Sequence, residues 1–526
     1  MKFRVIEYSC GEYCAKGERM DKDSNSIRRQ DCQTLQTEYL AGRKLILVSN
    51  RGPVAFAYDE NGERTVQRGG GGLVTALTGL AQHVDATWIA AADTQADKDF
   101  KEGDVPLDGD GKIRVKFIDP DPTEYEGYYN NISNPLLWFL QHNMWDGVRT
   151  PTVNRDTWNA WNDGYVKVNE QFAEAIAEEV KASDKPCLVM MQDYHLYLAP
   201  QFLRRKLRKH KNKNMKLMHF IHIPWPGPEG WAMLPRDMRQ AILDGLCSVD
   251  LLGFQTKDDA LNFIRTCESH MPRVSVNFKH GRIWVHNHST HVRDFPISID
   301  VDALRSLAGS DEVSHYREDI QGLTKDRKLI VRIDRTEPSK NIVRGFEAFG
   351  EMLELHPEHR GTVKFLGLFV PSRLGVDEYQ NYLDEIMASA GRVNAQYGSS
   401  DWEPIRILVG QDYPRAIAAL QLYDVLLVNA IADGMNLVAK EGPIVNKHDG
   451  VVVLSERTGA RQQLESGAIV ISPYDIYATA EALNNALHMP KKERAERANR
   501  LRWSIEREDI AEWLCLQLET LKELRL

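Results

Sequence analysis

The segment VLLVNAIADGMNLVAKE, residues 425–441, decides the fold of this chain. Its first part, VLLVNA (425–430), is an apolar run that predicts a buried strand, and the part after Gly434 predicts a helix. Asp433 opens the turn between them. Glu441 follows eight residues later, just over two helical turns, near the face that Asp433 presents. A strand, a tight turn and a helix in this order predict one unit of a parallel α/β sheet.

The predicted helix start offers groups that suit a phosphate-bearing ligand. The backbone amides of Met435, Asn436 and Leu437 would point out of the helix, where an anion is favoured. The carboxylates of Asp433 and Glu441 can accept hydrogen bonds from sugar and ribose hydroxyls. The combination favours a nucleotide-sugar site, and the alternative is a purely structural junction.

Similar units recur along the chain in two series. Apolar runs that predict strands lie at 45–50, 87–92, 187–192, 216–223 and 251–256, and again at 328–334, 362–370, 405–410, 425–430, 451–456 and 468–473. Helix-like stretches such as 164–182, 340–355 and 374–394 lie between them. The sequence therefore predicts an α/β protein in which two doubly wound, Rossmann-like domains face each other across a cleft, with ligands at the carboxyl ends of the strands.

The predicted domain limits follow from the two series. We expect an N-terminal extension over residues 1–43, a first domain over 44–310, a second domain over 311–503 and a C-terminal helix over 504–526. The segment FPISIDVDALRSL (295–307) is the expected hinge. The sequence leaves open whether the last helix packs back on the first domain.

Composition excludes several classes of function. The formal net charge of −9 argues against a general nucleic-acid or anionic-membrane binder. No apolar run has the length of a membrane span, and the first residues lack the apolar core of a signal peptide. The seven cysteines match no strong zinc pattern, so we expect a reduced, cytoplasmic protein without a bound metal. Small-molecule substrates are the expected partners, and homo-oligomerisation is left open.

Charged and glycine-rich segments follow the predicted strands. Arg51 follows the first strand, and the run RGGGGL (68–73) lets the backbone approach a ligand closely, although such a run is also typical of a flexible loop. His222 ends another strand, where the alternative is a satisfied core histidine. Arg335 and Lys340, five residues apart, would form a diphosphate clamp, and the alternative is a solvated loop.

With these residues in view, the chain resembles the retaining glycosyltransferases of the trehalose-6-phosphate synthase family (glycosyltransferase family 20), which have the GT-B fold. The likeness covers roughly residues 44–520. It rests on SNRGP (49–53), GGL (71–73), YYNNISNPLLW (128–138), QDYHL (192–196), HIPWP (222–226), RTEPSK (335–340), PSR (371–373), DGMNLVAKE (433–441) and LSE (454–456).

The resemblance implies a role for each matching position. Arg335 and Lys340 would hold the donor diphosphate near the amide of Gly72, and Glu441 would take the donor ribose. Asp433, His222 and the amides after Gly434, from Met435 through Asn436 and Leu437 to Val438, would hold the transferred sugar. The acceptor would be bound by Arg51, Tyr129, Trp138, Asp193 and Arg373.

The resemblance also implies a reaction. Glucose would pass from a nucleoside diphosphate, most simply UDP, to glucose 6-phosphate with retention, giving trehalose 6-phosphate. No residue is an obvious covalent nucleophile, so the leaving diphosphate would take the acceptor's proton while Arg335 and Lys340 stabilise its charge. No cofactor or metal is then required.

Four positions depart from the family's common pattern. Asn341 replaces a glycine, Ser298 a glycine in the hinge, Gln192 a histidine, and Ala91 a tryptophan that lies against the acceptor sugar in many relatives. RTEPSKN and TWIAAAD are similar to the branch containing the pseudo-glycosyltransferase that makes validoxylamine 7′-phosphate. Alternatives to glucose 6-phosphate are therefore a cyclitol phosphate or a glycerol phosphate as acceptor, or a catalytically silent sugar-phosphate sensor.

Overall fold

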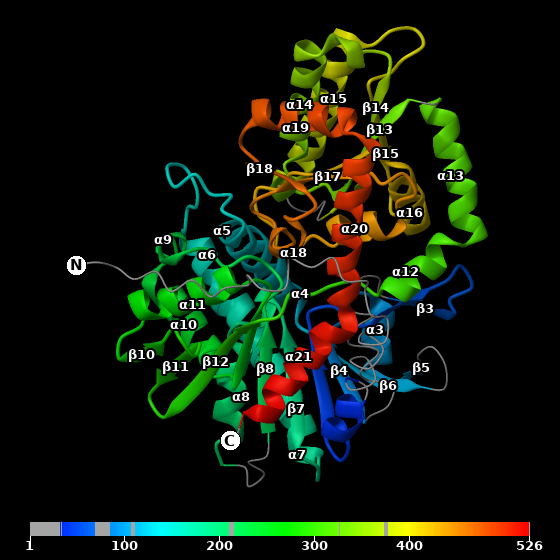
Figure 1. The fold of residues 1–526 in the computed structure, drawn as a ribbon. Coiled ribbons are helices and arrows are strands. Elements are labelled where there is room, and N and C mark those ends of the chain that lie inside the picture. Colours follow the sequence, from blue (N-terminus) through cyan, green and yellow to red (C-terminus); the bar gives the residue numbers. More distant parts are fainter. Residues whose placement is uncertain are drawn as a thin grey trace.

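The computed structural model describes residues 32, 34–68, 85–106, 111–209, 215–325, 327–372 and 377–524. Within these residues the strands form a ten-stranded sheet, a six-stranded sheet and a separate hairpin. The two sheets occupy different halves of the molecule, and their strands come from either side of the expected hinge (Figure 1). The chain is therefore a two-lobed α/β protein, as the sequence predicts.

The first sheet has a parallel centre and antiparallel edges. Its order is β10-β11-β12-β9-β8-β7-β1-β4-β6-β5, and β6 with β5, β10 with β11, and β11 with β12 are antiparallel pairs. The edges contain strands that the apolar runs did not predict, because these strands are short or carry polar side chains. The strands are β1 (Lys44–Val48), β4 (Ala86–Ala91), β5 (Glu102–Pro106), β6 (Lys112–Ile118), β7 (Cys187–Gln192), β8 (Met215–Phe220), β9 (Leu251–Phe254), β10 (Val274–Asn277), β11 (Arg282–Val285) and β12 (His288–Asp294), with β2 (Val54–Tyr58) and β3 (Arg64–Arg68) in the hairpin.

The second sheet is parallel throughout, in the order β15-β14-β13-β16-β17-β18. Each of its strands was predicted from an apolar run. The central strands are almost continuously hydrophobic because they are buried on both faces, whereas the edge strands β15 and β18 keep exposed residues. The strands are β13 (Lys328–Arg335), β14 (Val363–Val370), β15 (Ile405–Val409), β16 (Val425–Val428), β17 (Val451–Ser455) and β18 (Ile469–Ile471).

Helices connect and cover the strands of both sheets. Before the hinge segment they are α3 (Gln95–Phe100), α4 (Pro122–Glu126), α5 (Phe139–Gln141), α6 (Arg155–Asn159), α7 (Lys167–Ala182), α8 (Ala199–Leu207), α9 (Pro228–Trp231), α10 (Arg236–Leu246) and α11 (Lys257–His270). From the hinge segment onward they are α12 (Val301–Ala308), α13 (Asp311–Thr324), α14 (Ile342–Leu355), α15 (Asp377–Tyr397), α16 (Tyr413–Leu422), α17 (Val438–Val445), α18 (Arg461–Leu464), α19 (Ile476–His488), α20 (Lys491–Arg507) and α21 (Ile510–Glu523). Within the described residues, no helix is both long and apolar enough to cross a membrane.

Two wide π-helical segments interrupt the first half, η1 (Gly127–Trp138) and η2 (Ala160–Val166). They pack so closely that a Cβ on Gly164 would lie 2.6 Å from the backbone nitrogen of Tyr128. Pro135 lies inside η1 and cannot donate a backbone hydrogen bond there. The π-helical turns of η1 carry Tyr129 and Trp138, two of the predicted acceptor residues.

The last helices cross from the second lobe to the first. The predicted helix over 504–526 is divided, because α20 ends at Arg507 and Asp509 caps the start of α21. In Figure 1, α20 runs along the upper lobe and α21 lies across the lower one. Trp513 of α21 contacts Phe220 at 5.3 Å between ring centroids, and the Lys216 ammonium binds the carbonyl oxygens of Leu521 and Leu524 at the helix end.

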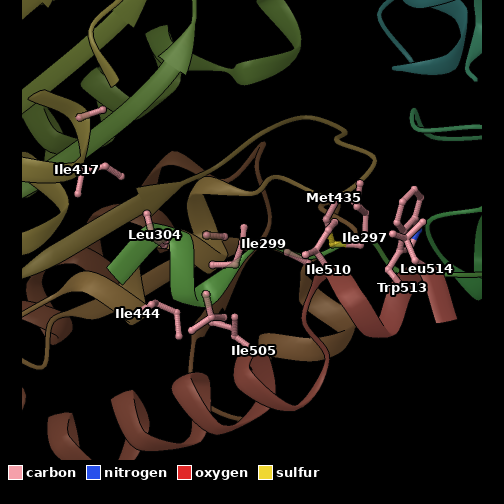
Figure 2. Close-up of a cluster of buried hydrophobic side chains, with 14 of the residues drawn as sticks. Ile297, Ile299, Leu304, Ile417, Met435, Ile444, Ile505, Ile510, Trp513 and Leu514 are labelled. Carbon is pink, nitrogen blue, oxygen red and sulfur yellow. The ribbon is translucent and has the colours of Figure 1, made fainter. Parts of the chain in front are cut away.

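The hinge segment is buried between these elements. Figure 2 shows Ile297, Ile299 and Leu304 packed among apolar side chains of α16, α17, α20 and α21, with Met435 beside them. They belong to one buried cluster that contains residues of both sheets. The backbone amide of Ile510 donates to the Ile299 carbonyl at 3.2 Å. The two lobes therefore share a core at the hinge.

Part of the expected N-terminal extension belongs to this fold. Residues 34–40 are helical, and Tyr39 and Leu40 are buried. Cys32 forms a disulfide with Cys515 of α21, so the expectation of a fully reduced chain is wrong at this pair. Sequence spacing could not reveal it, because 483 residues separate the partners. Cys187, Cys247 and Cys267 are free and buried, whereas Cys10 and Cys14 lie outside the described residues.

Candidate functional site

A buried ion pair joins the two predicted parts of the donor site. Lys340 ends the short helix η4 (Pro338–Lys340) after β13, and its Nζ lies 2.5 Å from Oδ2 of Asp433 in the turn after β16. Burial opposes both charges, but the attraction between the groups outweighs it. The attraction raises the pKa of Lys340 and lowers the pKa of Asp433. Both side chains are therefore charged at neutral pH.

Arg335, at the end of β13, is the second cation of the expected clamp. Its side chain is half exposed, forms an ion pair with buried Glu337 at 3.2 Å, and lies over the ring of Trp138 at 5.8 Å from the centroid. Trp138 belongs to the first half of the chain. The guanidinium is thus oriented by a carboxylate from its own loop and an aromatic ring from the opposite lobe.

Asn341 directly follows Lys340 and holds this loop in place through its side chain. Its φ of 61° lies in the left-handed region, which asparagine tolerates better than most residues other than glycine. Its side-chain amide donates to the carbonyls of Asn429 at 3.0 Å and Pro473 at 2.7 Å. Asn341 therefore tolerates a backbone conformation that favours glycine, and its side chain adds two hydrogen bonds.

The turn after β16 differs from its prediction. Helix α17 begins at Val438, so Met435, Asn436 and Leu437 are not its first turn, as the sequence suggested. Asn436 has a φ of 72°, which is incompatible with a helix. Its amide donates to Asp433 Oδ2 at 3.0 Å, and its Oδ1 accepts from the Ala439 amide at 3.2 Å. Asn436 therefore positions the Asp433 carboxylate and accepts a hydrogen bond from the first turn of α17.

Gly434 lies directly against the other lobe. A Cβ at this position would lie 1.8 Å from the backbone oxygen of His222, which follows β8. Gly459 is similarly close, because its Cβ would lie 1.9 Å from the Gly434 oxygen. Glycine is required here by the close approach of two backbones.

The side chain of His222 is held between two glutamines. Its Nε2 lies 2.9 Å from Oε1 of Gln192, and Nε2 of Gln255 lies 3.2 Å from its Nδ1. Burial lowers the pKa of His222 to about 3, so the ring is neutral at physiological pH. The two contacts select the tautomer with hydrogen on Nε2. The Oε1 of Gln192 accepts the hydrogen bond from this Nε2–H group.

Asp193 occupies a strained position at the end of β7. Its φ is 71°, uncommon for a residue other than glycine, and its Oδ1 accepts a hydrogen bond from the His222 amide at 3.2 Å. The His219 ring binds its backbone oxygen at 2.9 Å. These contacts hold the Asp193 carboxylate next to His222.

A row of rings connects the predicted acceptor residues with the clamp. The ring of Tyr129 stacks on His195 at 5.8 Å, His195 contacts Tyr194 at 3.9 Å, and Tyr194 contacts Trp138 at 5.5 Å. Arg51 is exposed and borders Tyr129, whose hydroxyl raises its pKa. The row runs from Arg51 to the ring that lies under Arg335.

Glu441 is held by a residue outside this group. Its Oε1 accepts a hydrogen bond from the hydroxyl of Tyr413 at 3.0 Å, and burial raises its pKa.

Two predicted residues, Gly72 and Arg373, lie outside the described residues. The structure adds neighbours that the sequence did not single out, namely His142, Gln255, Glu337 and Tyr413. Glu337 lies within the motif RTEPSK (335–340), but the sequence did not show that its carboxylate would pair with Arg335.

His142 shows why such neighbours escape detection. Its Nδ1 lies 2.8 Å from the Trp138 oxygen, and it is close enough to interact electrostatically with Asp433, Glu337 and Lys340. Burial lowers its pKa to about 4. Nothing in its local sequence distinguishes it from a core histidine. Two groups in the described chain have spacings that suit a metal, Cys32 with Glu512 and Cys515, and Glu358 with His359 and His488. The two cysteines of the first group are joined in the disulfide, and neither group contains a predicted site residue.

Residues 43–523 match the family model of glycosyltransferase family 20. The chain belongs to glycosyltransferase family 20. It is a glycosyltransferase with the GT-B fold. It is 33% identical over 466 residues to the UDP-forming α,α-trehalose-phosphate synthase of Schizosaccharomyces pombe, which covers 87% of this chain and 86% of that protein. It is 32% identical over 482 residues to synthase A of Dictyostelium discoideum, covering 91% of this chain but only 62% of that protein's length.

Solved structures agree with this assignment. The Escherichia coli protein bound with UDP-2-fluoro glucose superposes with a TM-score of 0.78 at 27% identity, covering 92% of this chain and 99% of that one. A UDP-forming synthase from Burkholderia xenovorans in complex with glucose-6-phosphate gives a TM-score of 0.77 at 26% identity, covering 91% of this chain and 100% of that one. The two-lobed fold of family 20 is thus conserved here.

Proposed function

We propose that this glycosyltransferase moves glucose from UDP-glucose to glucose 6-phosphate with retention, giving trehalose 6-phosphate and UDP. The observation that carries the proposal is the charged group formed by Lys340, Asp433 and Arg335, which faces Trp138 and His142 of the opposite lobe. The names of its relatives support the choice of substrates, since they are UDP-forming trehalose-phosphate synthases.

Arg335 and Lys340 stabilise the leaving diphosphate in this proposal. Each cation already has a carboxylate partner, so the ammonium and the guanidinium are held in place before the donor binds. Charge that develops on the leaving oxygen is met by groups that need no rearrangement. Protein cations therefore supply the neutralisation, and we expect turnover to persist after treatment with a metal chelator.

Asp433 and the His222 region hold the transferred sugar. The charged Asp433 carboxylate accepts sugar hydroxyls, and Asp193, fixed by the His222 amide, orients the acceptor. Both His222 ring nitrogens have glutamine partners. The ring therefore contacts a sugar hydroxyl only when one of these two hydrogen bonds is broken. Arg51 and Tyr129 bind the acceptor phosphate. We also propose that the protein acts in the cytoplasm, where nucleotide-sugars are made.

A second candidate has a different acceptor, and Ala91 favours it. Ala91 is buried at the end of β4, at the position where relatives carry a tryptophan against the acceptor sugar. A smaller side chain there alters the shape of the acceptor site. A cyclitol phosphate or a glycerol phosphate is then the alternative to glucose 6-phosphate.

An assay of nucleoside-diphosphate release tests both candidates. UDP-, GDP- and ADP-glucose are each combined with glucose 6-phosphate, with glycerol 3-phosphate, with a cyclitol phosphate and with no acceptor. We expect release with UDP-glucose and glucose 6-phosphate, and identification of trehalose 6-phosphate by chromatography. Release with another acceptor alone supports the second candidate. Binding of a sugar phosphate without any transfer identifies a sensor and contradicts the enzymatic proposal.

A further inference from the structure

The Glu441 carboxylate has a single donor among the described residues. The hydroxyl of Tyr413 donates to its Oε1 at 3.0 Å, and no other described group forms a hydrogen bond with this carboxylate. Two carboxylate oxygens offer about four acceptor positions. Most of the acceptor capacity of Glu441 is therefore open.

The environment of Glu441 favours additional donors. Burial raises its pKa, and the hydroxyl of Tyr413 opposes that shift. A carboxylate that is partly removed from water gains free energy from each further hydrogen-bond donor. A vicinal diol provides two such donors side by side, and the ribose of a nucleotide carries one at its 2′ and 3′ positions. The unfilled acceptor positions thus fit a ribonucleoside.

Tyr413 and Glu441 come from different units of the second sheet. Tyr413 is the first residue of α16, just after the carboxyl end of β15, and Glu441 lies in the first turn of α17. The strands β15 and β16 are separated in the sheet by β14 and β13, yet α16 packs against α17. The phenol therefore reaches the carboxylate only because the helices pack together. About half of the Tyr413 side chain stays exposed.

We infer that Tyr413 is a positioning residue for the nucleoside end of the donor site. Its hydroxyl holds one oxygen of Glu441, so that the carboxylate presents its remaining acceptor positions to the 2′- and 3′-hydroxyls of the ribose. The pair then selects ribonucleoside diphosphates over their deoxy counterparts. This inference rests on the proposed function, since it deepens the donor site described above.

The decisive experiment compares two nucleotides with two proteins. Binding of UDP and of 2′,3′-dideoxy-UDP is measured by calorimetry for the wild-type chain and for Tyr413→Phe, which keeps the ring and removes the hydroxyl. We expect the substitution to weaken UDP binding about tenfold, as for a lost hydrogen bond to a charged group. Binding of the dideoxy nucleotide should change less than twofold. In turnover, KM for the donor should rise while kcat stays nearly constant.

Two controls separate this role from a general structural one. Tyr477→Phe alters a tyrosine that is 60% exposed and should leave both affinities unchanged. In a Glu441→Ala background, Tyr413→Phe should have no further effect on UDP binding. An equal loss for both nucleotides, or no loss for UDP, overturns the inference while leaving the donor site intact. Failure of the wild-type chain to bind UDP overturns the proposed function together with it.

Discussion

Lys340 and Asp433 neutralise each other in a place from which water is largely excluded, with about one eighth of each side chain exposed. An isolated charge at such a position is costly, whereas a pair with additional hydrogen bonds is tolerated. Asn436 supplies one of these bonds to Asp433. The lysine therefore has two functions in our proposal, as the partner of Asp433 and as a ligand of the diphosphate.

Replacement of Lys340 by methionine should affect both functions. We expect kcat to fall by about a hundredfold or more, because a charge that stabilises the leaving group is lost. Stability should fall by about 3–5 kcal/mol, because Asp433 is left as an unpaired buried charge. Steady-state kinetics and urea denaturation measure the two effects.

A double variant separates the two effects of Lys340. Lys340→Met combined with Asp433→Asn removes the unpaired charge, so most of the stability should return while turnover stays low. Normal turnover by Lys340→Met would remove this residue from the site.

At the scale of elements, the turn after β16 joins the two lobes. Gly434 touches the His222 backbone, and Lys440 of α17 donates from Nζ to the Ile297 oxygen in the hinge at 2.6 Å. Burial lowers the pKa of Lys440 to about 7. The segment that carries Asp433 and Glu441 is thus attached to the first lobe at one point and to the hinge at another.

Gly434→Ala should separate these elements. The added Cβ would overlap the His222 oxygen, and because both contacting groups are backbone, the turn or the lobe must shift. We expect a loss of turnover of at least about tenfold, since displacement of reacting groups by 1 Å can cost about a hundredfold. Gly322→Ala in α13 is the matched control, because nothing lies within 4 Å of its Cβ. It should leave turnover unchanged and keep or raise stability. Equal activity of both variants would contradict a tight contact at Gly434.

At the scale of the whole molecule, α21 and the residues around Cys32 bind the chain ends to the first lobe. The disulfide between Cys32 and Cys515 restricts the unfolded chain. We expect dithiothreitol to lower the free energy of unfolding by about 2–4 kcal/mol, measured by urea denaturation. A non-reduced digest should contain the cross-linked peptide pair. In the Cys515→Ser variant, dithiothreitol should not change the free energy of unfolding. If reduction leaves the free energy of unfolding of the wild-type chain unchanged, the disulfide does not stabilise the fold.

Buried histidines should make the molecule sensitive to acid. Burial lowers the pKa of His142 and of His219 to about 4 each, whereas unfolded histidine titrates near 6.5. Between these values the unfolded chain binds more protons, so stability is full above about pH 6.5 and falls as the pH drops toward 4. In that range, each histidine lowers the free energy of unfolding by about 1.4 kcal/mol for each unit by which the pH falls. Urea denaturation at several pH values measures the slope, and His219→Gln should reduce it. An unchanged slope in that variant would show that His219 does not cause it.

Much of the fold could be predicted from local pattern. The second sheet was predicted strand by strand, because its central parallel strands are buried on both faces and its partly exposed edge strands β15 and β18 are also short apolar runs. The antiparallel edges of the first sheet were missed, because strands such as β5 and β12 alternate or carry histidine and charged residues. The start of α17 was placed three residues too early, because nothing in the sequence showed that Asn436 would adopt a left-handed conformation.

The sequence by itself determined the alternation of strands and helices, the family, and the residue types available for a donor site. These follow from short-range periodicity and from motifs, which do not depend on distant contacts. Only the tertiary structure decided which groups face each other: Lys340 with Asp433, Gly434 with the His222 backbone, Tyr413 with Glu441, and Cys32 with Cys515. Each of these pairs is brought together by packing between separate units, and the stretch 425–441 acquires its chemistry from partners that lie far away in the chain.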